Sequence, residues 1–253
     1  MRPPRTESTA PPVNSPFCIR AVTTISLVPP PSLSSTAPPA NVLLPAKCPV
    51  IGIAGGVGSG KSAVVRALQS VPLFVIDADS IGHQQLLCPA VRQKLLQQFG
   101  TQIANASGEI DRPKLAAIVF GDSPEQQAAR EQLNRIVRPG IRAQILNQLE
   151  NIPPNATAAI LDAALLLEAG WQQLCDAVIF VDTPLELRLQ RVAAARGWSP
   201  EELHRREASQ WPLEKKRAAA SHIIDNSTTL DAAASQLQTV LNQILNQPAQ
   251  IHR

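Results

Sequence analysis

A glycine-rich segment carries the clearest chemistry in the sequence. Residues 55–62 read Gly-Gly-Val-Gly-Ser-Gly-Lys-Ser, which fits the pattern G-x-x-x-x-G-K-S/T. Glycines permit positive φ, so successive backbone N–H groups can point at phosphate oxygens, and the start of the following helix points at the same anion. Lys61 can bridge the β- and γ-phosphates, and the Ser62 hydroxyl can ligate Mg²⁺. The alternative is a chance glycine-rich turn, but the position between an apolar run and a helix favours a site for ATP or GTP.

Two carboxylates follow the next apolar run. The run Leu73 to Ile76 reads as a buried strand, and Asp77 and Asp79 come directly after it. In a nucleotide-binding α/β fold this loop faces the phosphoryl acceptor, so a carboxylate here could orient an attacking hydroxyl and take its proton. The alternative is that Asp79 caps a helix that begins near Ser80, as many aspartates do. The motif alone leaves both interpretations open.

Alternating strands and helices must position these residues. We expect strands over 50–54, 73–76, 158–161, 177–181 and 222–224, and helices over 62–70, 90–99, 113–120, 124–149, 184–195, 200–208 and 230–244. Three of the strands end in an aspartate, at Asp77, Asp162 and Asp182. Strands separated by helices form a parallel sheet covered on both faces, and ligands bind at the carboxyl ends of its strands. The sequence therefore predicts an α/β protein with the three-layer α/β/α fold of P-loop NTPases, one helical insertion and a mobile helical lid.

Residues 1–47 differ in composition from everything that follows. They are rich in Pro, Ser and Thr, and the prolines exclude any long helix or central strand. Such a segment cannot bury enough apolar surface to offset its ordering entropy. We therefore expect a disordered extension over 1–47 and one folded domain over 48–248. A transit peptide, a secretory signal and a start site placed too early are alternative origins of the extension.

The composition excludes several classes of protein. The chain has 253 residues, 44% of them hydrophobic, with no tyrosine and a net charge of +3. Such a small charge gives no argument for a nucleic-acid partner, and no apolar run approaches the ~18 residues that indicate a membrane span. The cysteines (Cys18, Cys48, Cys88 and Cys175) are scattered, so neither a disulfide framework nor a zinc site is predicted. We expect a cytoplasmic protein, and the sequence does not indicate its oligomeric state.

Five segments of the chain, in this order, closely resemble the bacterial dephospho-CoA kinases over roughly residues 49–246. They read IGIAGGVGSGKS (51–62), VIDADSIGH (75–83), GEIDRPKLAAIVF (108–120), QWPLEKKR (210–217) and IIDN (223–226). The first segment is common to many P-loop enzymes, whereas the second and third are far more restrictive. The chain departs from the family pattern at Ala63, Arg138 and Ser221 and in the run DAALLLE (162–168), which bears mainly on acceptor binding.

The resemblance implies that ATP, with Mg²⁺, donates its γ-phosphate to the ribose 3′-hydroxyl of dephospho-CoA, in the last step of coenzyme A biosynthesis. It implies that Asp79 is the catalytic carboxylate, helped by Lys61 and by Arg191. For ATP it indicates Gly55, Gly56, Gly58, Ser59, Gly60, Lys61, Ser62, Ala63, Arg196 and Asn226, with Ser62 on the metal. For the acceptor we expect Asp77, Asp79, His83 and Glu168, the last because it follows a strand end.

The basic residues between 188 and 217 are interleaved with glutamates, so most of them read as a solvated helical face. Arg191 is set apart because the apolar residues of its helix form a buried stripe that leaves it on the flank, beside Arg188. Two other functions compete with the predicted one. They are a P-loop kinase for a nucleoside monophosphate or a sugar acid, and a nucleotide-binding switch, against which the absence of an NKxD run argues.

Deletion of residues 1–46 should leave the activity and the melting temperature nearly unchanged, because a Pro-rich disordered segment contributes few packed contacts. The measurement compares both quantities between the full chain and the truncated chain. A large loss in either would show that the extension docks on the domain.

Overall fold

Five apolar segments form one parallel sheet in the computed structural model, which describes residues 48–121 and 123–246. The strands are β1 (Val50–Gly55), β2 (Leu73–Asp77), β3 (Ala158–Asp162), β4 (Ala177–Asp182) and β5 (His222–Asp225). They lie in the order β2-β3-β1-β4-β5, and every pairing is parallel. Every residue of β1 and β3 is buried, as expected of strands covered on both faces. The predicted parallel sheet is confirmed.

The register of the sheet places the strand ends that carry polar residues at a common edge. Asp162 at the end of β3 is aligned with Asp77 of β2 on one side and with Ile53 of β1 on the other. From β1 the chain continues to β2 on one side of the sheet, whereas β4 lies on the other side of β1. The loop after β1 therefore lies at the point where the strand order reverses, which is where such sheets bind ligands.

Helices α1 (Lys61–Ala67) and α9 (Leu230–Asn246) cover one face of the sheet. Their buried residues pack in one cluster with residues of β1, β3, β4 and β5. Leu237 and Leu241 of α9 are fully buried and belong to the apolar face that packs on the sheet. Leu230, the first residue of the helix, is 41% exposed.

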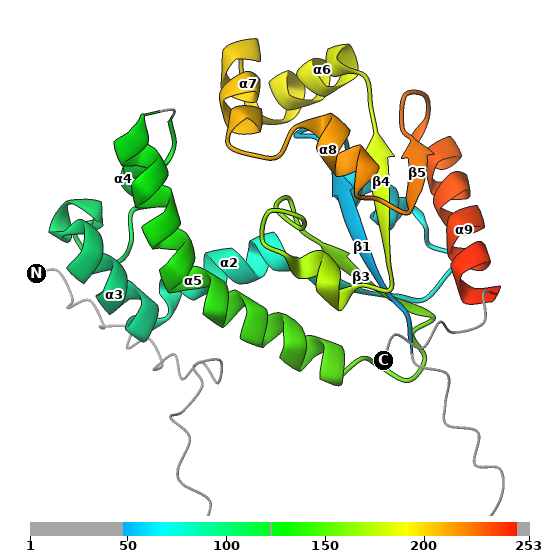
Figure 1. Cartoon of the computed structure of the whole chain (residues 1–253), viewed down its shortest axis with the longest axis horizontal. Helices are drawn as coiled ribbons and strands as arrows, with labels where there is room; N and C mark the ends of the chain where they lie inside the picture. Colours follow the sequence, from blue (N-terminus) through cyan, green and yellow to red (C-terminus); the bar gives the residue numbers. More distant parts are fainter. Residues whose placement is uncertain (1–47, 122, 247–253) are drawn as a thin grey trace, which may run out of the picture. The chain divides into compact units, whose positions relative to one another are not determined.

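The helical insertion lies between β2 and β3 (Figure 1). It consists of α2 (Ala78–Leu87), α3 (Pro89–Phe99), the short 3₁₀ helix η1 (Thr101–Ile103), α4 (Arg112–Val119) and α5 (Pro124–Glu150). Residues of α2 and α5 pack in the cluster that covers the second face of the sheet. Helices α3, α4 and η1 enclose a separate apolar cluster, which partly buried side chains of α5 join to the rest.

A second group of helices connects β4 to β5 and forms the predicted lid: α6 (Leu185–Arg196), α7 (Pro200–Ala208) and α8 (Leu213–Ala218). Figure 1 shows α6 and α7 beyond the carboxyl ends of β1 and β4. The guanidinium groups of Arg196 and Arg206 lie 4.6 and 4.7 Å from the ring centroid of Trp198, which connects α6 to α7. The mobility of the lid stays a prediction.

All described residues belong to one compact unit, and the expected domain bounds of 48–248 stay a prediction. The predicted disordered extension, 1–47, lies outside the described residues. Within the described ranges, no helix is both long and apolar enough to cross a membrane.

Candidate active site

The loop between β1 and α1 depends on glycines at two positions. Gly58 and Gly60 have φ angles of 76° and 83°, in the left-handed region where a side chain is strained. A Cβ at Gly58 would lie 2.8 Å from Cγ1 of Val192, and one at Gly60 would lie 2.7 Å from Nδ2 of Asn226. Neither position therefore has room for a side chain. Because glycine has no side chain, the backbone at both positions can take the conformation that a phosphate cradle requires.

Three side chains hold this loop by one backbone oxygen, the carbonyl of Ser59. It accepts hydrogen bonds from Nδ2 of Asn226 at 2.8 Å, from Oγ1 of Thr183 at 3.0 Å and from Arg191 at 3.2 Å. Arg191 also donates to the carbonyl of Asn226 at 3.1 Å. Arg191, which we expected to help catalysis, and Asn226, which we expected to contact ATP, therefore contact the loop itself, and their roles toward ATP remain predictions.

Lys61, the first residue of α1, lies among charges of both signs. Its Nζ donates to the carbonyl of Gly56 at 3.2 Å. Burial lowers the pKa of Lys61, while the carboxylates of Asp162 and Asp79 act in the opposite direction. Both aspartates thus lie close enough to stabilise the ammonium group. This places the lysine of the loop and the two carboxylates in one site.

Asp77 caps α2. The helix begins at Ala78, and Oδ1 of Asp77 accepts from the backbone N–H of Ser80 at 2.8 Å. The alternative that Asp79 is the helix cap was therefore wrong. Both carboxylate oxygens of Asp79 instead face the backbone N–H of Ala164, in the loop after β3, at 3.3 and 3.4 Å.

The surroundings of Asp79 favour its protonated form. Loss of water around the carboxylate raises its pKa above the ordinary value, and the charges of Asp162 and Asp77 raise it further. The N–H of Ala164 and the ammonium group of Lys61 lower the pKa and oppose this shift in part. A carboxylate with a raised pKa beside the phosphate loop has the properties of a general base.

Asp162 is a site residue that we did not predict, although we noted it at a strand end. It is 8% exposed and lies at the end of β3, between the strands that carry the phosphate loop and Asp79. Its charge acts on both Lys61 and Asp79. A signal was available in the sequence, because the carboxyl ends of neighbouring parallel strands meet at one edge.

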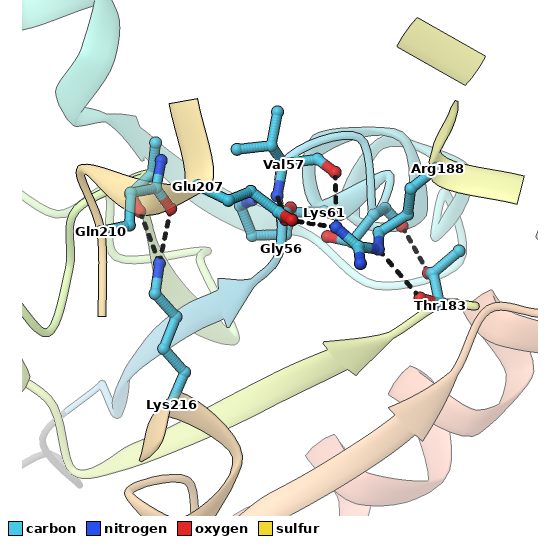
Figure 2. Close-up of polar contacts among 10 residues, drawn as sticks. Gly56, Val57, Lys61, Thr183, Arg188, Glu207, Gln210 and Lys216 are labelled. Carbon is cyan, nitrogen blue, oxygen red and sulfur yellow. Dashed lines mark hydrogen bonds and ion pairs between the residues drawn. The ribbon is translucent and has the colours of Figure 1, made fainter. Parts of the chain in front are cut away.

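An ion pair within the lid, which the sequence did not predict, lies against the phosphate loop (Figure 2). Arg188 of α6 is buried and pairs with Glu207 of α7. The carboxylate of Glu207 also accepts from the backbone N–H of Val57 at 3.3 Å. We expected Arg191 to be the important arginine of α6, whereas its neighbour one turn earlier is more deeply buried against the loop.

A second buried ion pair joins the lid to the loop after β3. Oε1 of Glu168 lies 2.9 Å from Nζ of Lys216 and accepts from the backbone N–H of Trp211 at 2.8 Å. Lys216 also donates to Gln210 at 2.7 Å, as Figure 2 shows. The carbonyl of Glu168 accepts a long hydrogen bond, 3.5 Å, from Arg138. Glu168 thus anchors the lid, and its contact with an acceptor remains a prediction.

Two other expected site residues lie at the margins of this site. His83 is one turn beyond Asp79 on α2, and its Nε2 is 2.8 Å from a guanidinium nitrogen of Arg112. Arg196 lies against Trp198, yet it is close enough to Lys61 to lower the lysine pKa. The hydroxyl of Ser62 and the side chain of Ala63 lie in the first turn of α1, directly after the loop.

Comparisons with known proteins agree on one family. A family model described as dephospho-CoA kinase (CoaE) matches residues 49–232. The chain is 36% identical to the dephospho-CoA kinases of Bacillus anthracis and Carboxydothermus hydrogenoformans, covering 77% of this chain and 96% and 94% of theirs. A crystal structure from Thermus thermophilus matches with a TM-score of 0.67 and 31% identity, over 78% of this chain and 98% of that one. A dephospho-CoA kinase from Campylobacter jejuni matches with a TM-score of 0.51 and 26% identity, over 79% and 98%.

Lys61→Ala should abolish phosphoryl transfer from ATP, because the positive charge of the lysine stabilises the negative charge on the phosphoryl group during transfer. Its ammonium group is desolvated in the folded chain, so its removal should leave the melting temperature close to that of the wild type. ADP release and thermal unfolding measure the two effects. Near-normal activity in this variant would refute the assignment of the glycine-rich loop as the phosphate site.

Proposed function

Since the chain belongs to the dephospho-CoA kinase family, we propose that it transfers the γ-phosphate of ATP to the ribose 3′-hydroxyl of dephospho-CoA, giving coenzyme A and ADP. One observation carries the assignment of its residues. Lys61 of the phosphate loop and Asp79 after β2 interact electrostatically with each other and with Asp162, whose strand β3 lies between β1 and β2. A donor phosphate held by the loop would thus lie next to a base for the acceptor hydroxyl.

The phosphates of ATP would be held mainly by the backbone N–H groups of residues 56–62. The conformation of Gly58 and Gly60 supports this role, because it allows successive N–H groups to point at one anion. The ammonium group of Lys61 would contact the β- and γ-phosphates and stabilise charge that develops during transfer. Arg191 stabilises the loop by donating a hydrogen bond to the carbonyl of Ser59.

The acceptor hydroxyl would be oriented by the carboxylate of Asp79. A loose phosphoryl-transfer transition state needs little covalent help, so the carboxylate mainly positions the hydroxyl and takes its proton late. A raised pKa suits this role, since the proton then moves to a group of better-matched basicity. The ammonium group of Lys61 opposes this shift and favours the ionised carboxylate, the form that accepts the proton.

The residues present fit Mg²⁺. The Ser62 hydroxyl in the first turn of α1 and the Asp162 carboxylate at the end of β3 are hard oxygen donors, which is the donor type that this ion prefers. Within the described residues, no group of three or more His, Cys, Asp or Glu side chains could hold a metal, which accords with an ion that shares its ligands with substrate phosphates. When bound, Mg²⁺ supplies positive charge that neutralises the phosphate oxygens.

The function is tested by ADP release with and without dephospho-CoA, and with nucleoside monophosphates and sugar acids as other acceptors. We expect ADP release to depend on dephospho-CoA and the product to be coenzyme A. Transfer to another acceptor would replace the proposed substrate, and hydrolysis that does not depend on any acceptor would indicate a nucleotide switch instead.

Asp79→Asn should lower kcat by about a hundred- to ten-thousand-fold, the usual contribution of a general base. ATP affinity should change little, because the loop carries that binding. Because the pKa of Asp79 is raised, wild-type kcat should fall as the pH drops through this raised value, where the carboxyl becomes protonated and can no longer accept a proton. The pH profile of the variant should lack this decrease.

Asp77→Asn is the matched control for Asp79→Asn. Asparagine caps a helix about as well as aspartate, so α2 should keep its start and the loss of activity should be the milder one. Measurement of kcat, nucleotide affinity and melting temperature for both variants separates catalysis from helix capping. Full activity in Asp79→Asn would refute the catalytic assignment while leaving the kinase assignment intact.

A further inference from the structure

Glu207 of the lid helix α7 places a carboxylate directly over the phosphate loop (Figure 2). Its Oε1 accepts from the backbone N–H of Val57 at 3.3 Å and pairs with the guanidinium group of Arg188. The side chains of Arg188 and Glu207 are only 5% and 20% exposed. A Cβ at Gly56 would lie 3.2 Å from the same carboxylate oxygen. An anionic group of the chain itself thus lies against the segment whose sequence indicates phosphate binding.

Arg188 is held in this place by groups other than Glu207. Its Nε donates to the carbonyl of Thr183 at 3.1 Å, and its NH1 lies 3.5 Å from the carbonyl of Val57. The first carbonyl follows β4, and the second belongs to the phosphate loop itself. The guanidinium group should therefore stay beside the loop when Glu207 is absent. A buried positive charge without an anion is costly, so another anion would be favoured in its place.

We infer that Glu207 and the phosphates of a bound nucleotide compete for the same two donors, the N–H of Val57 and the guanidinium group of Arg188. The inference rests on the proposed function, in which residues 55–62 bind ATP. A carboxylate and a phosphate both accept hydrogen bonds only, and two anions at one site repel each other strongly where water is scarce. Glu207 therefore lowers the affinity of the loop for ATP, and nucleotide binding displaces it.

The attachment of α7 allows such a displacement. Leu203 is the one residue of α7 that is fully buried, and the rest of the helix is partly or wholly exposed. Gly197, with a φ of 65°, ends α6 just before the segment that leads into α7. A helix with one buried anchor and a glycine at its approach can shift at modest cost. Phosphate binding and the position of this part of the lid are therefore coupled through Glu207.

The test is the affinity for adenine nucleotides in Glu207→Gln, measured by titration calorimetry on the full chain. ADP and a non-hydrolysable ATP analogue, each with Mg²⁺, are the probes. Glutamine keeps the size and an acceptor oxygen but removes the charge, so we expect Kd to fall about tenfold or more, since charged hydrogen bonds are the stronger ones. An unchanged or higher Kd overturns the inference, because the carboxylate would then only hold Arg188 in place.

Glu202→Gln is the matched control, because Glu202 lies on the same helix and also pairs with arginines, Arg205 and Arg206. Its contacts are within α7 and do not reach the loop, so its nucleotide affinity should equal that of the wild type. An equal gain in both variants would indicate a general effect of charge and would overturn the specific role of Glu207. If the wild-type chain binds no nucleotide, the proposed function and this inference fail together. Normal wild-type binding with no gain in Glu207→Gln overturns the inference alone.

Glu207→Asp provides the second variant, in case the glutamine variant does not fold. Aspartate keeps the charge that neutralises Arg188, but its shorter side chain withdraws the carboxylate from the N–H of Val57. We expect Kd to fall several-fold, less than in Glu207→Gln, and the melting temperature to rise more on addition of ADP than in the wild type. A Kd equal to or above the wild-type value would overturn the inference.

Discussion

The carbonyl oxygen of Ser59 is the point on which the active site depends. A loop that directs its N–H groups toward phosphate turns its carbonyls the other way, and these need donors from elsewhere in the chain. Here the donors come from Thr183, Arg191 and Asn226, which are 124, 132 and 167 residues away in the sequence. The second half of the chain therefore supports the nucleotide cradle, through residues that follow β4 and β5 and through α6.

The parallel sheet brings a second constraint, the crowding of carboxylates at its polar edge. Asp77, Asp79 and Asp162 follow or end two neighbouring strands, so their charges meet. The fold balances them with Lys61, with the N–H of Ala164 and with the start of α2, which Asp77 caps. The raised pKa of Asp79 is a result of this arrangement, since two like charges and the loss of water outweigh one lysine and one N–H group.

The strands and most helices could be predicted because their periodicity is local, and the phosphate loop because its motif is contiguous. The assignment of Asp77 and Asp79 could not be settled in this way, because it depends on α2 starting at Ala78 rather than near Ser80. The sequence pattern places Arg188 and Arg191 together on the flank of α6, whereas the structure buries Arg188 against Glu207 of another helix, which the pattern could not show. Contacts between the lid and the loop join segments about 130 to 150 residues apart, which no local pattern reports.

The tryptophans of the lid give the protein an optical property of its own. The chain has three tryptophans and no tyrosine, so its ultraviolet emission comes from the indole rings of Trp171, Trp198 and Trp211 alone. Trp171 lies in the core, whereas Trp198 and Trp211 lie in the connections before and after α7, each with a cationic group over its ring. Because two of the three tryptophans flank the helix that carries Glu207, the intrinsic fluorescence of the unlabelled protein should change when that helix moves.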